Sequence, residues 1–352
     1  MRILFHAPYK ITDLTSGSRV RPNMMIEAFK ELGYIVDVVS GSLPERKHIY
    51  RNNVNRLEHY AFCYSEPSTY PVHPVWDYWF YYQLDKANIP LGIFYRDAYW
   101  KIVPHWTQKN IVQKTILQIR YRSDICLFNK TARVIFFPSK SLSDFFSFHN
   151  KGVLWPGCNN NIKDGEKSTF NKPYTVIYVG NIAPRYGLRL LLETMELVNE
   201  WEEVNLELVC PAESYTQNIY EFAGYKNKAW LRIHHLSGEK LEPLYDRANI
   251  GIITLLRNQY NDLAMPVKLF EYLSYGLPVV VTNCTEMASF VTNNHVGLAV
   301  TDTSKELRKA ILLLLEDSGL FINSARAVHR TINNGNLWKD RANAVAQSLL
   351  EL

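Results

Sequence analysis

Short apolar segments alternate along the whole chain with segments of helical length, and this alternation limits the folds that are open to it. Several of the apolar segments are nearly continuous runs, as in YTVIYVG, NIGIITL and LPVVVT. Such runs are typical of strands buried on both faces, which occur in parallel sheets covered by helices. The pattern therefore predicts an α/β protein with doubly wound, Rossmann-like sheets.

The expected strands form two sets separated by a polar stretch. Residues 159–173 are rich in Asn, Lys, Gly and Pro and show no periodicity, which predicts a linker. A chain of 352 residues usually needs more than one core, so we expect two domains, residues 1–158 and 174–335. Strands are expected at residues 2–6, 35–40, 91–96 and 133–139 in the first domain, and at 174–180, 204–210, 230–236, 249–255, 277–282 and 297–300 in the second.

Composition indicates a soluble, cytoplasmic protein. The chain is 47% hydrophobic and 21% charged, as in ordinary globular proteins. No apolar run approaches the length of a membrane span, and the first residues enter a strand without a cleavable leader pattern. The five cysteines are far apart and form no CxxC pair, which favours a reducing compartment and no metal site.

Positive charge is concentrated in the first half of the chain. Residues 1–165 carry 21 Lys and Arg against 13 Asp and Glu, a net +8, whereas residues 166–352 carry 18 against 21, a net −3. A basic half indicates an acidic partner or an anionic membrane surface. A solvated basic face is an equally good interpretation, and no nucleic-acid partner is expected.

The segment MPVKLFEYLSYGLPVVVT, residues 265–282, raises a question about Lys268. Pro266 suits the first helical position, and Gly276 suits the left-handed residue that ends a helix. A lysine in the first turn has the wrong sign for the helix dipole, unless an anion binds there. Free N–H groups and an ammonium form a phosphate site, and Glu271, one turn on, can accept hydrogen bonds from a ribose diol. The alternative is a surface ion pair between Lys268 and Glu271.

This segment, preceded by LYDRANIGIITL, resembles the donor-site region of the GT-B glycosyltransferases, in particular glycosyltransferase family 4 (group 1). Residues 174–198 resemble the start of that family's second domain, and residues 132–158 resemble the end of its first. Residues 336–352 resemble its closing helix, which crosses back to the first domain. The resemblance implies two Rossmann-like domains facing a central cleft, with the acceptor in the first and a nucleotide-sugar donor in the second.

The resemblance also implies roles for single residues. Glu271 matches the second glutamate of the family's Glu-x7-Glu signature, which contacts the donor ribose, whereas the first glutamate is replaced by Leu263. Lys268 fits a Pro-x-Lys-x-x-Glu-Tyr pattern, in which it meets the diphosphate. Asn181 and Tyr186 occupy positions where the family often has an arginine and a lysine, and Asp262 lies one residue out of register with the missing glutamate. We therefore assign the diphosphate to Lys268 and to Arg185, next to the lysine position, with Asn181 as a further donor-site residue.

Two first-domain residues are candidates for the same reaction. Gly17, in TSGSR between the first expected strand and helix, lies where the family has a glycine-containing loop near the donor phosphates. Asp97 follows the strand at 91–96, where an α/β sheet presents functional side chains and where many family members have a histidine. Its carboxylate can deprotonate an acceptor hydroxyl, orient that hydroxyl, or pair with Arg96 or Arg19.

Two further segments point to the acceptor. The aromatic run at 70–83 is typical of sugar stacking or of a membrane interface. Residues 109–124 combine basic and aliphatic residues at helical spacing, as in a helix that binds an anionic leaflet. An ordinary surface helix that packs its apolar side on the sheet is the alternative. The basic residues are Lys109, Lys114, Arg120 and Arg122, and the aliphatic ones are Ile111, Val112, Ile116, Leu117 and Ile119.

These features predict a glycosyltransferase (EC 2.4 class) that moves a sugar from a nucleoside-diphosphate donor to a saccharide or lipid-linked saccharide, in bacterial-type cell-surface polysaccharide synthesis. The sequence has no Asp-x-Asp motif, so we expect no cofactor and no metal requirement. We expect a cytoplasmic protein, and peripheral attachment to the inner face of the plasma membrane is compatible with that location. A catalytically degenerate scaffold and another GT-B enzyme, such as a nucleotide-sugar epimerase, are the alternatives.

Overall fold

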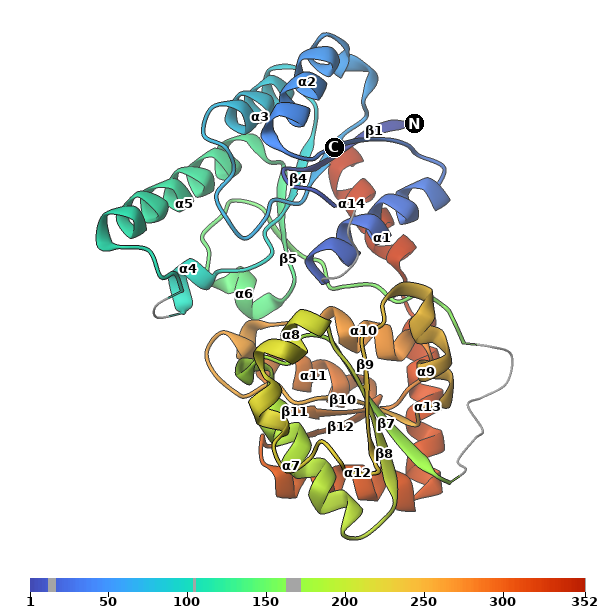
Figure 1. Ribbon diagram of the computed structural model, residues 1–352. Coiled ribbons are helices and arrows are strands. Elements are labelled where there is room, and N and C mark those ends of the chain that lie inside the picture. Colours follow the sequence, from blue (N-terminus) through green and yellow to red (C-terminus); the bar gives the residue numbers. More distant parts are fainter. Residues whose placement is uncertain (12–16, 104–105, 163–171, 352) are drawn as a thin grey trace. The chain divides into compact units, whose positions relative to one another are not determined.

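The computed structural model describes residues 1–351 except 12–16, 104–105 and 163–171, and it divides into two compact units. The first unit holds Met1–Pro156 together with Trp338–Leu352, and the second holds Gly157–Leu337 (Figure 1). Most of the linker expected at 159–173 lies outside the described residues. None of the described helices is long and apolar enough to cross a membrane.

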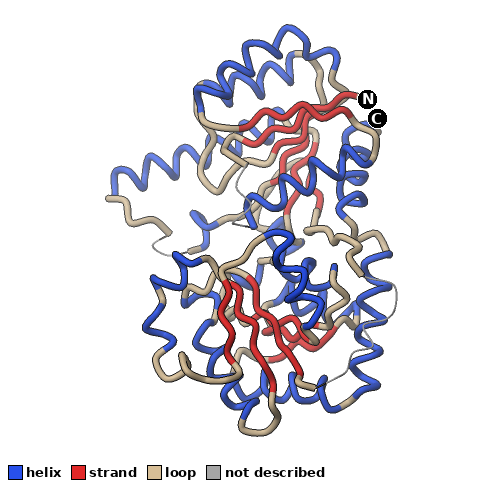
Figure 2. Tube along the Cα trace, turned by 45° about the vertical axis from the view of Figure 1, so that its right-hand side comes forward, coloured by secondary structure: helices blue, strands red, loops and turns tan. Residues whose placement is uncertain are grey.

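Six parallel strands form the sheet of the first unit, in the order β2-β1-β3-β4-β5-β6. Figure 2 draws the strands of both units in red. All residues of β4 and β5 are buried, as their continuous apolar sequences predict. The short strand β3 has no counterpart among the expected strands, because three residues are too few to show a period. The strands are β1 (Arg2–Ala7), β2 (Ile35–Ser40), β3 (Cys63–Ser65), β4 (Leu91–Phe94), β5 (Val134–Phe137) and β6 (Lys151–Val153).

Helices cover both faces of this sheet, and one of them comes from the end of the chain. The last helix, α14, packs against α1 and β4, and an added Cβ on Gly92 of β4 would lie 3.0 Å from Leu349 of α14. The first-unit helices are α1 (Gly17–Glu31), α2 (Leu43–Asn53), α3 (Trp76–Lys86), α4 (Tyr99–Ile102), α5 (Ile111–Thr131), α6 (Lys140–Asp144) and α14 (Trp338–Leu350), with a 3₁₀ segment η1 (Val54–His59).

The first helix begins earlier than its sequence predicts. A loop is expected up to Pro22, because proline in a helix interior removes a hydrogen bond, but α1 begins at Gly17 and includes Pro22. The buried side chains of Met25, Ile26 and Phe29 hold the helix on the sheet and outweigh the proline. The expectation of a loop at Gly17 is therefore wrong, and residues 12–16 lie outside the described part.

The second unit has its own six-stranded parallel sheet, in the order β12-β11-β10-β7-β8-β9. All six strands lie where the sequence predicts them, with ends that differ by at most two residues. They are β7 (Tyr174–Val179), β8 (Val204–Val209), β9 (Leu231–His234), β10 (Ile250–Ile253), β11 (Val279–Thr282) and β12 (Gly297–Val300).

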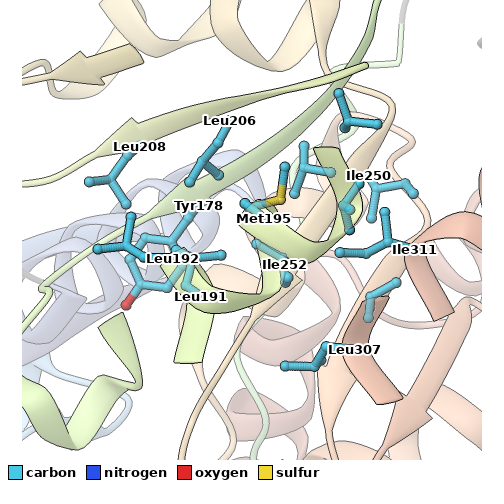
Figure 3. Packing of buried hydrophobic residues seen from close by; sticks show 14 of the residues in the cluster. Tyr178, Leu191, Leu192, Met195, Leu206, Leu208, Ile250, Ile252, Leu307 and Ile311 are labelled. Carbon is cyan, nitrogen blue, oxygen red and sulfur yellow. The ribbon is translucent and has the colours of Figure 1, made fainter. Parts of the chain in front are cut away.

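A hydrophobic core joins one face of this sheet to α7 and α12. Leu191 and Met195 of α7 meet Ile252 of β10 and Ile311 of α12, and Tyr178 of β7 packs beside the leucines (Figure 3). The helices of the unit are α7 (Leu188–Asn199), α8 (Ala212–Gln217), α9 (Glu242–Arg247), α10 (Val267–Ser274), α11 (Thr285–Asn294), α12 (Ser304–Glu316) and α13 (Ser318–Asn333). Its 3₁₀ segments are η2 (Pro184–Tyr186), η3 (Ile219–Phe222), η4 (Gly238–Leu241) and η5 (Asn261–Leu263).

The close approach of β11 and β12 yields a stability prediction. Gly297 has φ +153°, and an added Cβ would lie 1.9 Å from the carbonyl oxygen of Val279. We expect Gly297→Ala to lower the free energy of unfolding by about 3 kcal/mol or more, measured by urea denaturation. The control is Gly224→Ala, where φ is +88° but no atom lies within 4 Å, and it should cost only about 1 kcal/mol. Equal losses in the two variants would contradict the steric explanation.

Candidate functional site

The helix α10 carries two of the candidate residues at the carboxyl-terminal edge of the second sheet. Pro266 is the N-cap residue rather than the first helical residue, so α10 begins at Val267 and Lys268 lies in its first turn. The helix ends at Ser274, just before Gly276, which has the expected left-handed conformation (φ +73°), and β11 follows. The local signals of proline, glycine and apolar strand therefore predicted this segment to within two residues.

Tyr272 fixes α10 against two strands. Its hydroxyl donates a hydrogen bond to the carbonyl of Ile252 in β10 (3.3 Å) and accepts one from the N–H of Val179 in β7 (2.9 Å). An added Cβ on Gly251 would lie 2.4 Å from the Tyr272 ring, so β10 needs glycine there. Because Tyr272 is fully buried, the first turn of α10 is held at the ends of β7 and β10.

Lys268 is a partly buried cation, and the described residues offer it no ion pair. Its Nζ lies 4.0 Å from the ring centroid of Tyr178 and 6.0 Å from that of Tyr186. The side chain of Lys268 fits beside Gly180 because glycine has no side chain there; an added Cβ would lie only 3.1 Å from the Lys268 Nζ. Burial lowers the pKa of the Lys268 ammonium to about 7, and the charge of Glu271 opposes this only in part.

Glu271 lies one turn further along α10 and is also partly buried. Burial raises the pKa of its carboxyl, while a hydrogen bond with Tyr245 and the charge of Lys268 act in the opposite direction. No ion pair joins Glu271 to Lys268 in the described part of the chain, so the surface ion-pair interpretation of this segment is not supported. The charges of the two groups influence each other's pKa although they form no ion pair.

Arg185 and Lys268 approach the same tyrosine ring. The guanidinium of Arg185 lies 4.8 Å from the Tyr186 ring centroid and donates a hydrogen bond to the Tyr186 hydroxyl (2.9 Å). The structure therefore brings two of the expected cations together around Tyr186. Gly187, with φ +75°, follows directly, and its missing side chain lets the loop pass against the carbonyl of Thr254.

Asn181 shapes the loop after β7. Its side-chain oxygen accepts hydrogen bonds from the Ala183 N–H and the Ser214 hydroxyl, each at 3.0 Å. Its backbone carbonyl accepts one from the hydroxyl of Tyr178 (2.6 Å), whose ring supports Lys268. These bonds give Asn181 a positioning role in the same loop that carries Arg185.

The family's first signature glutamate is replaced by Leu263, so its position provides no carboxylate to the loop that carries Arg185. Leu263 is buried in η5. Asp262, one residue earlier, accepts hydrogen bonds from the Arg257 side chain (3.2 Å) and from the Thr285 N–H at the start of α11 (3.0 Å). Asp262 therefore anchors α11 and does not take the place of the glutamate.

Asp97 lies in the first unit, three residues after the end of β4, and is partly buried. It accepts hydrogen bonds from the Thr69 hydroxyl (2.8 Å) and the Tyr99 N–H (3.4 Å), and burial raises the pKa of its carboxyl. Arg96 instead reaches the Tyr9 hydroxyl and Glu66. The side chain of Arg19, the other expected partner, lies outside the described residues.

A pocket beside Asp97 was not expected from the sequence. Its walls come from the loop at residues 67–70, the end of β4 and the helix α5, which contributes Tyr121, Asp124 and Phe128. The Asp124 carboxylate accepts hydrogen bonds from Tyr78 and from the N–H of Val72, and burial raises its pKa to about 6. The only sequence signal for Asp124 is that it is the one acidic residue of α5.

Among the described residues, no group of three or more His, Cys, Asp or Glu is placed to hold a metal ion. The groups available at the second-unit site are cations, a carboxyl, aromatic rings and the amides of a helix start. This set matches a phosphorylated ligand with hydroxyl groups.

Comparison with known proteins supports this description. Residues 173–317, which include Asn181, Arg185, Lys268 and Glu271, match the family model described as Glycosyl transferases group 1. The match confirms the resemblance to group 1 glycosyltransferases for the second unit. No curated protein matches the sequence significantly.

The whole chain shares its fold with several solved structures. HepE of Anabaena, solved with UDP and glucose, is 14% identical, has a TM-score of 0.69, and aligns over 99% of both chains. WaaG, a glycosyltransferase involved in lipopolysaccharide biosynthesis, is 11% identical with a TM-score of 0.67, over 99% of this chain and 100% of that one. An α,α-trehalose-phosphate synthase from Burkholderia xenovorans, solved with glucose-6-phosphate, is 11% identical with a TM-score of 0.66, over 99% of both chains. The expected GT-B fold is thereby confirmed.

The buried charge of Lys268 predicts a pH-dependent cost to stability. The pKa of Lys268 falls from 10.5 to about 7 on folding. The charged ammonium therefore lowers the free energy of unfolding by its full amount below pH 7, and this loss disappears as the pH rises toward 10.5. We expect Lys268→Met to raise the free energy of unfolding by roughly 1–2 kcal/mol at pH 6 and by much less at pH 10. Urea denaturation at both pH values measures this, with Lys309→Met on the exposed side of α12 as control. A gain of the same size at both pH values would contradict the assignment.

Proposed function

We propose that this chain, whose second unit is that of a group 1 glycosyltransferase, transfers a sugar from a nucleoside-diphosphate donor to a saccharide or lipid-linked saccharide. The observation that carries the proposal is the partly buried Lys268 ammonium, which has no ion pair among the described residues and lies in the first turn of α10. UDP is the nucleotide we propose to test first, because HepE was solved with UDP and glucose.

The donor would bind with its diphosphate at the start of α10. Lys268 and Arg185 would neutralise the charge that develops on the leaving diphosphate, and the amides of the first helical turn would add hydrogen bonds. Glu271, one turn on, would accept the hydroxyl groups of the ribose. Asn181 and Tyr186 would hold the loop that carries Arg185, and Gly17 remains a proposed contact of the donor phosphates.

The acceptor would bind in the first unit, beside Asp97. The raised pKa of this carboxyl and its bond from Thr69 suit a group that orients or deprotonates a hydroxyl. We further propose that the reaction needs no metal ion, since Lys268 and Arg185 supply the positive charge that a bound metal supplies elsewhere. We also propose that the chain acts in cell-surface polysaccharide synthesis and that its basic first unit attaches peripherally to an anionic membrane.

A catalytically degenerate scaffold is the second candidate. The replacement of the family's first glutamate by Leu263 and of its lysine by Tyr186 favours this alternative. It predicts that no nucleotide sugar binds, whereas an epimerase predicts donor turnover without an acceptor. Nucleotide binding therefore comes before any assay of transfer.

Binding of UDP should involve the protonation of Lys268. Below pH 7 the free ammonium is already charged, but above it a bound diphosphate must first draw a proton onto the amine. We expect isothermal titration calorimetry at pH 8.5 to show nearly one proton taken up per UDP, and the affinity to fall by up to about tenfold per pH unit above pH 7. In Lys268→Met, affinity at pH 7 should fall at least ~10-fold and the proton uptake should vanish.

The control for this experiment is Lys309→Met, which should behave as the wild type because Lys309 is exposed on α12. Unchanged UDP affinity in Lys268→Met would show that the diphosphate binds elsewhere. If neither UDP, GDP, ADP nor their sugar derivatives bind the wild type, the scaffold alternative is favoured.

Asp97 should affect transfer and leave donor binding intact. We expect Asp97→Asn to keep the UDP affinity of the wild type and to slow sugar transfer by about 100-fold or more. In the wild type the rate should fall as the pH drops through the raised pKa of this carboxyl, because only the ionised form accepts a proton. Release of UDP from UDP-sugars with a panel of saccharide acceptors measures both effects. Wild-type transfer by Asp97→Asn would limit this residue to a structural role.

A further inference from the structure

The N-terminal half of α5 exposes aliphatic side chains that have no place in the core. Ile111, Val112, Ile116 and Ile119 are 76%, 64%, 53% and 57% exposed. The last three are spaced by four and three residues, so they lie on one face of the helix. Leu117 is buried on the opposite face. This half of α5 therefore packs Leu117 inward, as an ordinary surface helix would, and in addition exposes a row of aliphatic side chains.

The charge on α5 is almost entirely positive. Arg122 and Lys130 are exposed on the helix and Lys109 is exposed just before it, whereas Lys114 is half-buried; the one acidic residue is Asp124, which is 4% exposed. The exposed surface of α5 therefore presents cations and no carboxylate. Arg120 is turned inward, where it donates a hydrogen bond to the carbonyl of Val72 (2.9 Å).

We propose that the N-terminal half of α5 docks on an anionic lipid surface. An exposed apolar face with flanking cations fits the boundary between acyl chains and phosphate headgroups. A second copy of the chain is a poorer occupant, because a symmetric contact would bring the cations of two α5 helices together. Figure 1 shows α5 extending outward from the first unit, with its N-terminal end away from the sheet.

The C-terminal half of the same helix builds the pocket beside Asp97. Tyr121 and Asp124 line that pocket, and the Tyr121 hydroxyl donates a hydrogen bond to the carbonyl of Thr69, whose own hydroxyl bonds to Asp97. From Ile116 to Asp124 the helix rises about 12 Å. The docking face and the acceptor pocket therefore share one helix, so docking would bring a lipid-anchored acceptor near Asp97. The assignment of a lipid-linked saccharide as the acceptor rests on the proposed function.

Vesicle flotation of the full-length protein tests the docking surface. We expect the wild type to float with vesicles of phosphatidylcholine and phosphatidylglycerol, but at least ~5-fold less with phosphatidylcholine alone. The double variants Ile116→Ser/Ile119→Ser and Lys114→Glu/Arg122→Glu should each reduce flotation at least ~5-fold. The matched control is Leu313→Ser/Ile322→Ser, which changes two aliphatic residues of the second unit that are 48% and 40% exposed.

Three results would overturn the proposal. The first is that the wild type does not float with anionic vesicles. The second is that flotation is unchanged in both α5 variants. The third is a dimer in solution that Ile116→Ser/Ile119→Ser dissociates, which would assign the face to a second copy. UDP binding, measured in parallel, should be unchanged in the α5 variants. A wild type that floats without binding any nucleotide would remove the proposed function and leave the docking surface standing.

Discussion

The hydrogen bonds of the Tyr272 hydroxyl to β7 and β10 decide where the candidate donor site lies. These bonds hold the first turn of α10 at the end of β7. As a result, the Lys268 side chain contacts the Tyr178 ring and occupies the space that a side chain at position 180 would fill. Parallel strands bring their carboxyl ends to one edge, so loops that are far apart in sequence meet there. The loop with Arg185 and the helix with Lys268 meet at Tyr186 for this reason.

The environment of Lys268 is unfavourable for folding and favourable for binding an anion. The aromatic face of Tyr178 compensates only part of the lost hydration of the ammonium, and this is why its pKa is low. A diphosphate would supply the missing negative charge in a site that is already assembled. Local destabilisation of this kind is common at functional sites, where residues are retained for a ligand and not for the fold.

The sequence predicted the second unit better than the first, and the reason is physical. Its strands are buried on both faces and appear as apolar runs, and the α10 segment carries local signals at Pro266 and Gly276. In the first unit β3 is too short to show a pattern, and α1 runs through Pro22 because buried side chains outweigh a local rule. The Asp97 pocket could not be predicted, since Thr69, Tyr121 and Asp97 meet only through tertiary contacts.

The nucleotide end and the sugar end of the candidate donor site differ in chemistry. In the proposed site, Lys268, Arg185 and Glu271 would offer charge to a diphosphate and a ribose, whereas Leu263, at the position of the absent glutamate, and Met265, two residues on, are buried apolar residues. Asp262 cannot replace that glutamate, because Arg257 and the start of α11 already use its carboxylate. Apolar contacts distinguish weakly between sugars that differ by a hydroxyl. Under the proposed function, selection of the donor sugar would therefore come from groups other than a carboxylate at these positions.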